Sequence, residues 1–290
     1  MKKTILLNKF NSERIFTLKR LSIVLGIPPE VLLDFSETAV EHYHPYIQTK
    51  GAKKRKISNP SEALKAIQKK ISKKILSLVP LPAEILGGRK GMSIKENAKI
   101  HLRQPEVVTI DLRDCFPSIS FKTVFDLFRN DFGYSKEVSS ILTKLTTYRR
   151  SLPQGGVTSG DLVNILLIPL CGKIRSIIRV GNRLSLWVDD ITFSGKNVHQ
   201  YCQEVVNIIQ MFGYRTRSKK VKVMTNNHPQ TVTGTMVNSK VSVPKKKIEI
   251  YLSDFRNKAV SDLSTSGRVI HTSFINPVQA RRLKKRIAVR

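Results

Sequence analysis

An adjacent pair of acidic residues, Asp189-Asp190, constrains the fold of this chain more than any other feature. The pair stands between two apolar runs, Leu184–Val188 and Ile191–Phe193, which are rich in β-branched and aromatic residues. This pattern predicts a strand, a tight turn and a second strand. Placing two carboxylates between buried strands costs free energy unless something compensates their charge. Taken alone, the pair is best explained as a solvated hairpin turn.

A third carboxylate, Asp111, makes a metal site the better explanation. It follows another apolar run, Val107–Ile110, and therefore stands at the end of a predicted strand. Three carboxylates at neighbouring strand ends suit a hard, oxygen-seeking cation, and Mg²⁺ fits this donor set. The sequence thus predicts that Asp111, Asp189 and Asp190 form a metal site.

The charge of the chain points to a polyanionic partner. The formal net charge is +30, from 51 Lys and Arg against 21 Asp and Glu. This excess indicates nucleic acid. A membrane surface is less favoured, because the basic residues are spread along the chain.

The stretch 50–74 is the most basic part of the first third, with ten Lys or Arg and one acidic residue. It predicts a hairpin or loop over 50–56 and then a helix, with Asn59 as N-cap, Pro60 as first helical residue and Glu62 as reciprocal cap. The lysines of this helix form either a solvated face or a phosphate-contacting surface, and the total charge favours the second.

Cysteine content and hydropathy bear on the compartment. The three cysteines, Cys115, Cys171 and Cys202, lack zinc-like spacing, so we expect thiols in a reducing, cytoplasmic setting. The most apolar stretch, 162–171, is too short to span a bilayer, and no membrane association is expected.

The order of predicted elements indicates a mixed α/β (α+β) fold. After the strand ending at Asp111 come helices, the Asp189-Asp190 hairpin, another helix and further strands. This order fits a split βαβ sheet of the ferredoxin-like kind. The predicted elements are helices from Ser120, over 135–148, over 161–178 with a kink near Pro169 and over 197–212, and strands over 221–224 and 231–237.

Three segments together resemble a reverse transcriptase. Residues 108–119 resemble the first catalytic block of that family, Leu-Pro-Gln-Gly at 152–155 its nucleotide-positioning block, and Trp-Val-Asp-Asp at 187–190 its Tyr-x-Asp-Asp block. Asn97-Ala98-x-x-His101 and Val232-Thr233-Gly234 are similar to marks of bacterial retron reverse transcriptases. Residues 55–68 and 274–290 resemble the fingers and the thumb end of the retron type.

The resemblance implies a right-hand polymerase fold with fingers, a ferredoxin-like palm sheet and a small thumb. It places the N-terminal region and fingers at 1–105, the palm at 106–235 with a fingers-contributing helical insertion around 130–160, and the thumb at 236–290.

The resemblance also implies an RNA-directed DNA polymerase, in which a hydroxyl attacks the α-phosphorus of a deoxynucleoside triphosphate. Two Mg²⁺ ions about 3.5–4 Å apart would stabilise the attacking and leaving oxygens. Asp111 and Asp189 would be the main metal ligands, and Asp190 would support the site. Asp114 is interpreted as structural.

Four further residues would contact the nucleotide. Arg55 would grip the triphosphate, a task that suits a guanidinium. Gln154 would contact nucleotide or template, and Lys220 matches a lysine that protonates pyrophosphate, although Lys219 stands beside it. Phe116 matches an aromatic that blocks the ribose 2′-hydroxyl, and an ordinary core phenylalanine explains it equally well.

By the same resemblance, the partner is a dedicated structured non-coding RNA, copied into a small DNA joined to RNA. The RNA–DNA hybrid would then be the product, and a separate effector protein would complete an antiphage system. The implied RNA-contacting residues are Asn97, His101, Thr233, Arg281, Arg282, Lys284 and Lys285. For Asn97, His101 and Thr233, a structural role is the alternative.

Two rival functions stay open at this point. One is a catalytically silent scaffold that binds RNA or RNA–DNA, and the other is a different bacterial reverse transcriptase type. The chain departs from the common family pattern at Trp187, which replaces Tyr, and at Gly156, Val157 and Gly160, which replace Ala, Pro and Pro. None of these changes removes a carboxylate, so activity is still expected.

Overall fold

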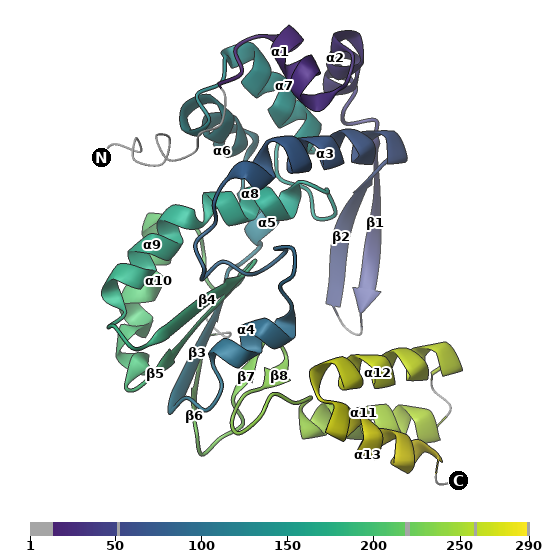
Figure 1. Ribbon diagram of the computed structural model, residues 1–290, viewed down its shortest axis with the longest axis vertical. Coiled ribbons are helices and arrows are strands. Elements are labelled where there is room, and N and C mark those ends of the chain that lie inside the picture. Colours follow the sequence, from purple (N-terminus) through teal and green to yellow (C-terminus); the bar gives the residue numbers. More distant parts are fainter. Residues whose placement is uncertain (1–13, 51–52, 218–220, 258–259, 289–290) are drawn as a thin grey trace. The chain divides into compact units, whose positions relative to one another are not determined.

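The computed structural model describes residues 14–50, 53–217, 221–257 and 260–288. The chain divides into two compact units, each discontinuous in sequence (Figure 1). The first comprises Met1–Ala83 and Arg113–Leu170, and the second comprises Glu84–Leu112 and Cys171–Arg290.

The first unit combines helices with one long hairpin. The hairpin pairs β1 with β2 in antiparallel register from Tyr43↔Pro60 to Lys50↔Lys53, as expected for a hairpin in the basic stretch. Its elements are α1 (Leu18–Leu25), α2 (Pro29–Glu37), β1 (Tyr43–Lys50), β2 (Lys53–Pro60), α3 (Glu62–Lys74), η1 (Leu76–Leu78), α5 (Cys115–Ser118), α6 (Phe121–Asp126), a π-helical turn η2 (Leu127–Asp131), α7 (Lys136–Thr146) and α8 (Ser159–Leu166).

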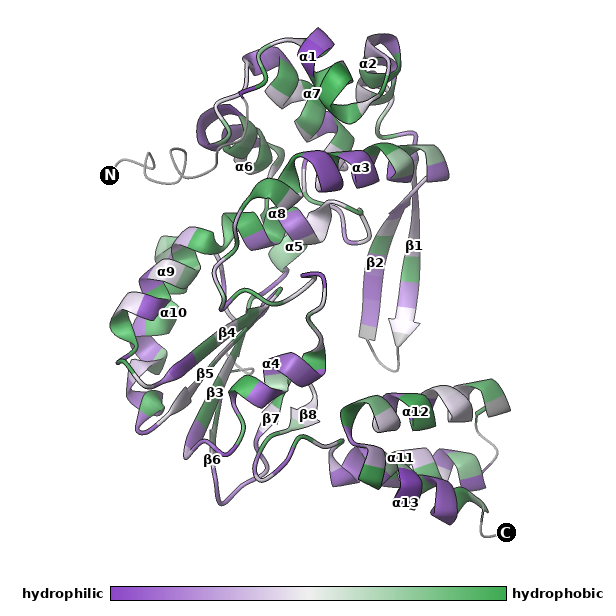
Figure 2. Ribbon diagram, viewed as in Figure 1, coloured by the Kyte–Doolittle hydropathy of each residue, from purple (hydrophilic) through white to green (hydrophobic). Residues whose placement is uncertain are grey.

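The start of α3 corrects one prediction. Strand pairing extends β2 through Asn59 and Pro60, so neither residue begins the helix. Ser61 is the N-cap, and its Oγ accepts a hydrogen bond from the Leu64 amide at 3.3 Å. The helix buries Leu64, Ile67 and Ile71, and Figure 2 shows both hydrophilic and hydrophobic residues along it.

The second unit is built on a four-stranded antiparallel sheet with strand order β4-β5-β3-β6. This order, with helices between β3 and β4 and between β5 and β6, is the predicted ferredoxin-like arrangement. The elements are α4 (Ile94–Ile100), β3 (Glu106–Asp111), α9 (Ile168–Ile177), which crosses the unit boundary after Leu170, β4 (Arg183–Trp187), β5 (Asp190–Gly195), η3 (Val198–Tyr201), α10 (Cys202–Met211), β6 (Lys222–Thr225), β7 (Thr231–Val232), β8 (Thr235–Met236), α11 (Lys245–Arg256), α12 (Asp262–Ile275) and α13 (Pro277–Ala288).

The two faces of this sheet differ in polarity because strand side chains alternate. One face is apolar and buried, and it carries Leu184, Leu186, Val108, Ile110, Ile191 and Phe193. The helical turn η3, which contacts β3 and β5, lies on this side. The opposite face carries Asp111 and Asp190 at one end and Val107 at the other.

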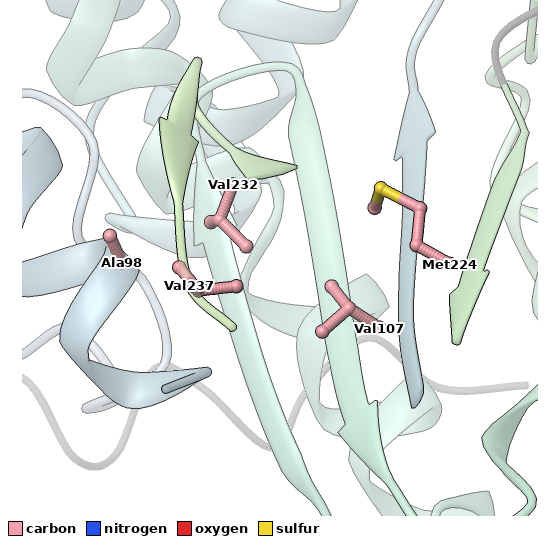
Figure 3. Packing of buried hydrophobic residues seen from close by; sticks show 5 residues of the cluster. All are labelled: Ala98, Val107, Met224, Val232 and Val237. Carbon is pink, nitrogen blue, oxygen red and sulfur yellow. The ribbon is translucent and has the colours of Figure 1, made fainter. Parts of the chain in front are cut away.

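The Val107 end of the second face is covered by α4 and the β7–β8 hairpin. Figure 3 shows the cluster of buried side chains formed there, which come from elements far apart in the sequence. Its members are Ala98, Val107, Met224, Val232 and Val237. This packing fixes α4 on the same face of the sheet as the carboxylates.

Several local predictions were refined by the structure. The apolar helix predicted over 161–178 is broken at Leu167 into α8 and α9, near the expected kink. The predicted strand over 231–237 is instead the two-residue hairpin β7–β8, because Thr233 and Gly234 both have positive φ, 46° and 76°. None of the described helices is long and apolar enough to cross a lipid bilayer.

Candidate active site

The acidic pair sits at a hairpin turn in the second unit. β4 pairs with β5 through Trp187↔Asp190, and β3 pairs with β5 through Asp111↔Asp190. Residues directly opposite each other in an antiparallel pair project to the same face of the sheet. Asp111, Asp190 and Trp187 therefore form one row across three strands.

The third carboxylate is held at the turn by backbone contacts. The Leu112 amide donates a hydrogen bond to the Asp189 carbonyl at 2.8 Å, which joins the turn to the end of β3. Val188, the residue before it, has a φ of 57°. This left-handed conformation is rare for a β-branched residue and costs about 1–3 kcal/mol. Strain of this kind is concentrated at functional sites.

Gly87 allows the segment after Glu84 to approach the turn. The Leu186 amide donates to the Glu84 carbonyl at 2.7 Å, and the Gly87 amide donates to the Leu186 carbonyl at 3.3 Å. A Cβ atom on Gly87 would lie 2.7 Å from Val188 Cγ2, closer than real side chains approach. Only glycine fits at this position without moving the turn.

Asp111 has a cationic neighbour. Arg217 Nε lies 3.3 Å from Asp111 Oδ1, and the Arg217 amide donates to the Asp111 carbonyl at 3.2 Å. The Asp111 side chain is 15% exposed, and the Arg217 side chain is 42% exposed. The carboxylate thus already stabilises a positive charge at this end of the strand.

Asp111 and Asp190 offer carboxylate oxygens from two neighbouring strands at one end of the sheet, and a hard divalent cation prefers such donors. Among the residues that the structure describes, no three His, Cys, Asp or Glu side chains are gathered closely enough to hold a metal ion. The metal ligands Asp111, Asp189 and Asp190 therefore stay a prediction.

In the first unit, the loop 152–158 is held against β2. The Ser58 amide donates to the Gln154 carbonyl at 2.8 Å. Gly155 has a φ of 120°, and a Cβ there would lie 3.0 Å from the Ser58 carbonyl oxygen. The loop lies this close to β2 because residue 155 is glycine.

Two departures from the family pattern have a structural explanation in this loop. The Val157 amide donates to Gln68 Oε1 at 2.9 Å, a bond that proline has no N–H to make. A Cβ on Gly156 would lie 2.7 Å from Ser159 Oγ, so alanine does not fit this loop conformation. Nothing in the structure explains Gly160.

Three of the predicted nucleotide-contacting residues, Arg55, Phe116 and Gln154, belong to the first unit. Arg55 is exposed on β2, and Phe116 is half-buried on α5. Gln154 is half-buried in the loop that β2 holds. Asp114 precedes α5 and forms an ion pair with Arg113 at 3.4 Å. Lys220 and its neighbour Lys219 lie outside the described residues.

The two retron-like motifs meet on the carboxylate face of the second unit. Asn97 on α4 donates through Nδ2 to Thr233 Oγ1 at 3.5 Å, across 136 residues of sequence. Asn97 is fully buried, Thr233 is half-buried and Gly234 is exposed. The exposed part of this pair of motifs is therefore the β7–β8 turn.

His101, at the end of α4, connects that helix to two strands. Its Nδ1 lies 2.7 Å from Ser194 Oγ on β5, and its Nε2 lies 2.8 Å from Ser185 Oγ on β4, both within hydrogen-bonding distance. The imidazole is 0% exposed. Burial, with a smaller contribution from the charge of Arg183, lowers the pKa of His101 to about 3. The ring is therefore neutral at physiological pH.

A basic surface lies on α13. Ala280 and Leu283 point inward, and Leu283 packs with Val243, Ile248, Leu252 and Ile275. The intervening residues of the helix are exposed, as the 3.6-residue period requires. The exposed cations include the predicted Arg281, Arg282, Lys284 and Lys285, together with Arg286.

Comparison with known proteins identifies the class to which this fold and site belong. The sequence model for the reverse transcriptase (RNA-dependent DNA polymerase) family matches residues 47–254. The chain belongs to this family, and its curated relatives place it with the retron-type reverse transcriptases. The predicted family is confirmed.

Three relatives are similar over much of this chain. The retron Se72 reverse transcriptase of Salmonella heidelberg (strain 579083-10) is 34% identical over 192 residues, covering 64% of this chain and 50% of the relative. The retron Ec86 reverse transcriptase of Escherichia coli is 31% identical, covering 72% and 68%. The retron Mx65 reverse transcriptase of Myxococcus xanthus is 26% identical, covering 90% and 69%. The chain thus spans between half and about two thirds of their lengths.

Solved structures support the fold. A telomerase from Candida albicans, in complex with a fragment of telomeric RNA, has a TM-score of 0.50 at 10% identity, covering 78% of this chain and 53% of that one. An apo telomerase from Candida tropicalis has a TM-score of 0.50 at 12% identity, covering 75% and 61%. The predicted right-hand polymerase fold is confirmed.

Sequence reasoning missed several residues that shape the site. Gly87 begins a glycine doublet, and this doublet is its sequence signal of a close approach. Arg217 was one of several basic residues before β6, and its pairing with Asp111 depends on the fold. Ser185 and Ser194 alternate with apolar residues on β4 and β5, which marks them as inward-facing hydroxyls on the polar face.

Proposed function

We propose that this chain copies RNA into DNA at the end of the sheet that carries Asp111, Asp189 and Asp190. The observation that carries the proposal is the register Asp111↔Asp190, which places carboxylates from two strands on one face. The hydrogen bond from the Leu112 amide to the Asp189 carbonyl holds the Asp189 backbone at the end of β3. Family membership supplies the type of reaction.

Mg²⁺ is the proposed cofactor, held by these three carboxylates. When bound, it stabilises charge on the attacking and leaving oxygens of phosphoryl transfer. The protein contributes a half-buried, anionic strand end where Asp111 already attracts the Arg217 guanidinium.

The incoming deoxynucleoside triphosphate is assigned to residues of the first unit and to Lys220 of the second. Arg55 is exposed on β2 and offers a planar guanidinium to phosphate oxygens. Gln154 contacts the nucleotide or template from the loop that Ser58 holds. Phe116 limits space at the ribose, and Lys220, outside the described residues, donates a proton to pyrophosphate.

RNA recognition is assigned to two surfaces. The β7–β8 turn presents Thr233, while the buried Asn97 and His101 take part by holding the turn and α4 in place. The second surface is the basic face of α13, where Arg281, Arg282, Lys284 and Lys285 contact phosphates.

In this proposal, fingers occupy 1–105, palm 106–235 and thumb 236–290, with a fingers-contributing insertion around 130–160. The helices α11 to α13 share a hydrophobic cluster, against which Ile94 of α4 also packs, and this cluster supports the thumb assignment. The template and primer is a dedicated structured non-coding RNA, and the product is a small DNA joined to RNA. A separate effector protein joins them in an antiphage system in the cytoplasm, where Cys115, Cys171 and Cys202 stay reduced.

A catalytically silent RNA-binding scaffold is the second candidate. The ion pair between Arg217 and Asp111 favours it, because a guanidinium occupies the carboxylate that a metal ion needs. The two candidates differ in one property, since only a polymerase leaves newly made DNA bound to the protein.

The test uses protein purified from cells that carry the native flanking DNA. Co-purifying nucleic acid is extracted, treated separately with RNase and DNase, and compared with that from an Asp189→Asn plus Asp190→Asn variant. We expect a small DNA joined to RNA with the natural protein and RNA alone with the variant. RNA alone in both samples would refute the retron polymerase and support the scaffold.

A further inference from the structure

A basic cavity lies in the first unit, and its lining includes no residue of β2 or of the loop 152–158. Its volume is about 620 Å³, and α2, the start of α6, α7 and the turn after α7 line it. These helices contact one another, with α2 and α6 both packed on α7 (Figure 1). The charged side chains of the lining are Lys122, Lys144, Arg149, Arg150 and Glu37.

The two arginines occupy a turn that is unusual for them. The Tyr148 amide donates to the Ser151 carbonyl at 2.8 Å and the Ser151 amide to the Tyr148 carbonyl at 3.1 Å, which defines a two-residue hairpin. Arg149 and Arg150 have φ values of 45° and 67°. Turns with positive φ at both central positions favour Asn-Gly, so two arginines here are strained. Strain at such positions points to a function for the side chains.

Backbone and ring contacts hold the Arg149-Arg150 turn at the wall of the cavity. The Phe121 amide donates to the Arg150 carbonyl at 2.8 Å, which ties the turn to the start of α6. The Arg149 guanidinium lies 5.4 Å from the centre of the Tyr148 ring. Both guanidiniums are thus carried on a backbone that α6 and a buried tyrosine hold in place.

The charge of the cavity is not balanced from within. Lys122 pairs with Asp126 at 2.7 Å. The structure shows no ion pair with another described residue for Lys144, Arg149 or Arg150. All three side chains are exposed. Apart from the paired Lys122, three cations against one carboxylate, Glu37, leave an excess of positive charge that attracts an anion.

We propose that this basic cavity binds the phosphodiester backbone of single-stranded RNA, with Arg149 and Arg150 as the principal phosphate contacts. The inference depends on the proposed function only for the choice of RNA, while the phosphate chemistry follows from the cavity itself. Forked guanidiniums suit the geometry of phosphate oxygens.

The test replaces Arg149→Asn plus Arg150→Gly. Asn-Gly is the favoured sequence for this turn, so the variant keeps or gains thermal stability while losing both guanidiniums. A matched control, Lys19→Gln plus Lys136→Gln, removes two exposed charges of the same unit outside the cavity. Both variants and the natural protein are titrated onto a labelled 20-nucleotide oligouridylate, and affinity is measured by fluorescence anisotropy from 0.05 to 0.5 M salt.

Each phosphate contact with a single strand contributes about 0.7 to the slope of log affinity against log salt. Losing two contacts should lower the magnitude of the slope by about 1.4. For each tenfold decrease in salt concentration, the affinity of the variant should therefore rise about 25-fold less than the affinity of the natural protein. The control should change the slope by less than half of this. An unchanged slope in the Asn-Gly variant, or equal losses in both variants, would overturn the proposal.

Two further measurements distinguish RNA from a free anion as the ligand, and RNA binding from DNA synthesis. If inorganic phosphate or triphosphate at millimolar concentration binds the natural protein, and the Asn-Gly variant loses only that binding, the ligand is a free anion and the RNA assignment is refuted. Failure of DNA synthesis with the slope difference intact would refute the proposed function and leave the cavity assignment standing.

Discussion

Burial of His101 should make the stability of the second unit depend on pH. The folded protein keeps this imidazole neutral, because burial lowers its pKa to about 3. In the unfolded chain, the same group has its ordinary pKa of about 6.5. Below that value the unfolded state binds a proton that the folded state does not. The stability contributed by the neutral ring is therefore fully present above pH 6.5 and is lost as pH falls.

The size of the loss follows from the linkage between proton binding and folding. Between pH 7.5 and 5.0, protonation of this one group in the unfolded chain should lower the free energy of unfolding by about 2 kcal/mol. Glu96 and Glu106 in the same unit have lowered pKa values and titrate below this window. His271 also has a lowered pKa, and it is only half-buried, so its contribution should be smaller.

Urea unfolding followed by the fluorescence of Trp187 measures this effect. Trp187 is the only tryptophan of the chain and lies on β4, the strand that His101 contacts through Ser185. The difference in unfolding free energy between pH 7.5 and 5.0 should be about 2 kcal/mol larger in the natural protein than in His101→Gln. The variant His271→Gln should keep most of the pH dependence. Equal pH dependence in the natural protein and His101→Gln would refute the reasoning.

Three further substitutions test the site. Gly87→Ala should push a methyl group into the β4–β5 turn and slow DNA synthesis at least about tenfold. The control Gly172→Ala, whose new methyl group meets no atom within 4 Å, should not slow synthesis, and equal rates for the two variants would contradict this. Gln68→Leu removes buried hydrogen bonds to Tyr43 and Val157 and should destabilise the first unit by about 3 kcal/mol in thermal unfolding, and a loss under about 1 kcal/mol would contradict it. Arg217→Gln removes the cation beside Asp111 and should lower the Mg²⁺ concentration for half-maximal synthesis about threefold, whereas a rise would argue that Arg217 supports the site.

The sheet of the second unit was predictable because its strands alternate. Val108 and Ile110 face the apolar side, while Val107 and Asp111 face the other, and this pattern is visible in the sequence alone. The acidic pair at the turn and Asp111 at a strand end identified two strands that turned out to be direct neighbours. Local patterns of this kind survive folding because they decide which face is buried.

Other features depend on contacts between distant segments. Asn59 and Ser61 are both good N-cap residues, and pairing of β2 with Tyr43 decided between them. The positive φ of Thr233 could not be inferred for a residue that favours strands, so the β7–β8 hairpin was missed. The three helices after residue 244 bury their apolar faces mainly against one another, which a short basic sequence does not reveal.

Synthesis of DNA on an RNA template is the most direct test of the central claim. A purified protein is given an RNA template with an annealed primer, deoxynucleoside triphosphates and Mg²⁺, and primer extension is followed on a gel. The natural protein and Asp114→Asn, whose carboxylate pairs with Arg113 outside the row, should extend the primer. Asp189→Asn plus Asp190→Asn should reduce the rate about 1,000-fold. Extension by the double variant at the natural rate, or no extension by folded natural protein, would contradict the account.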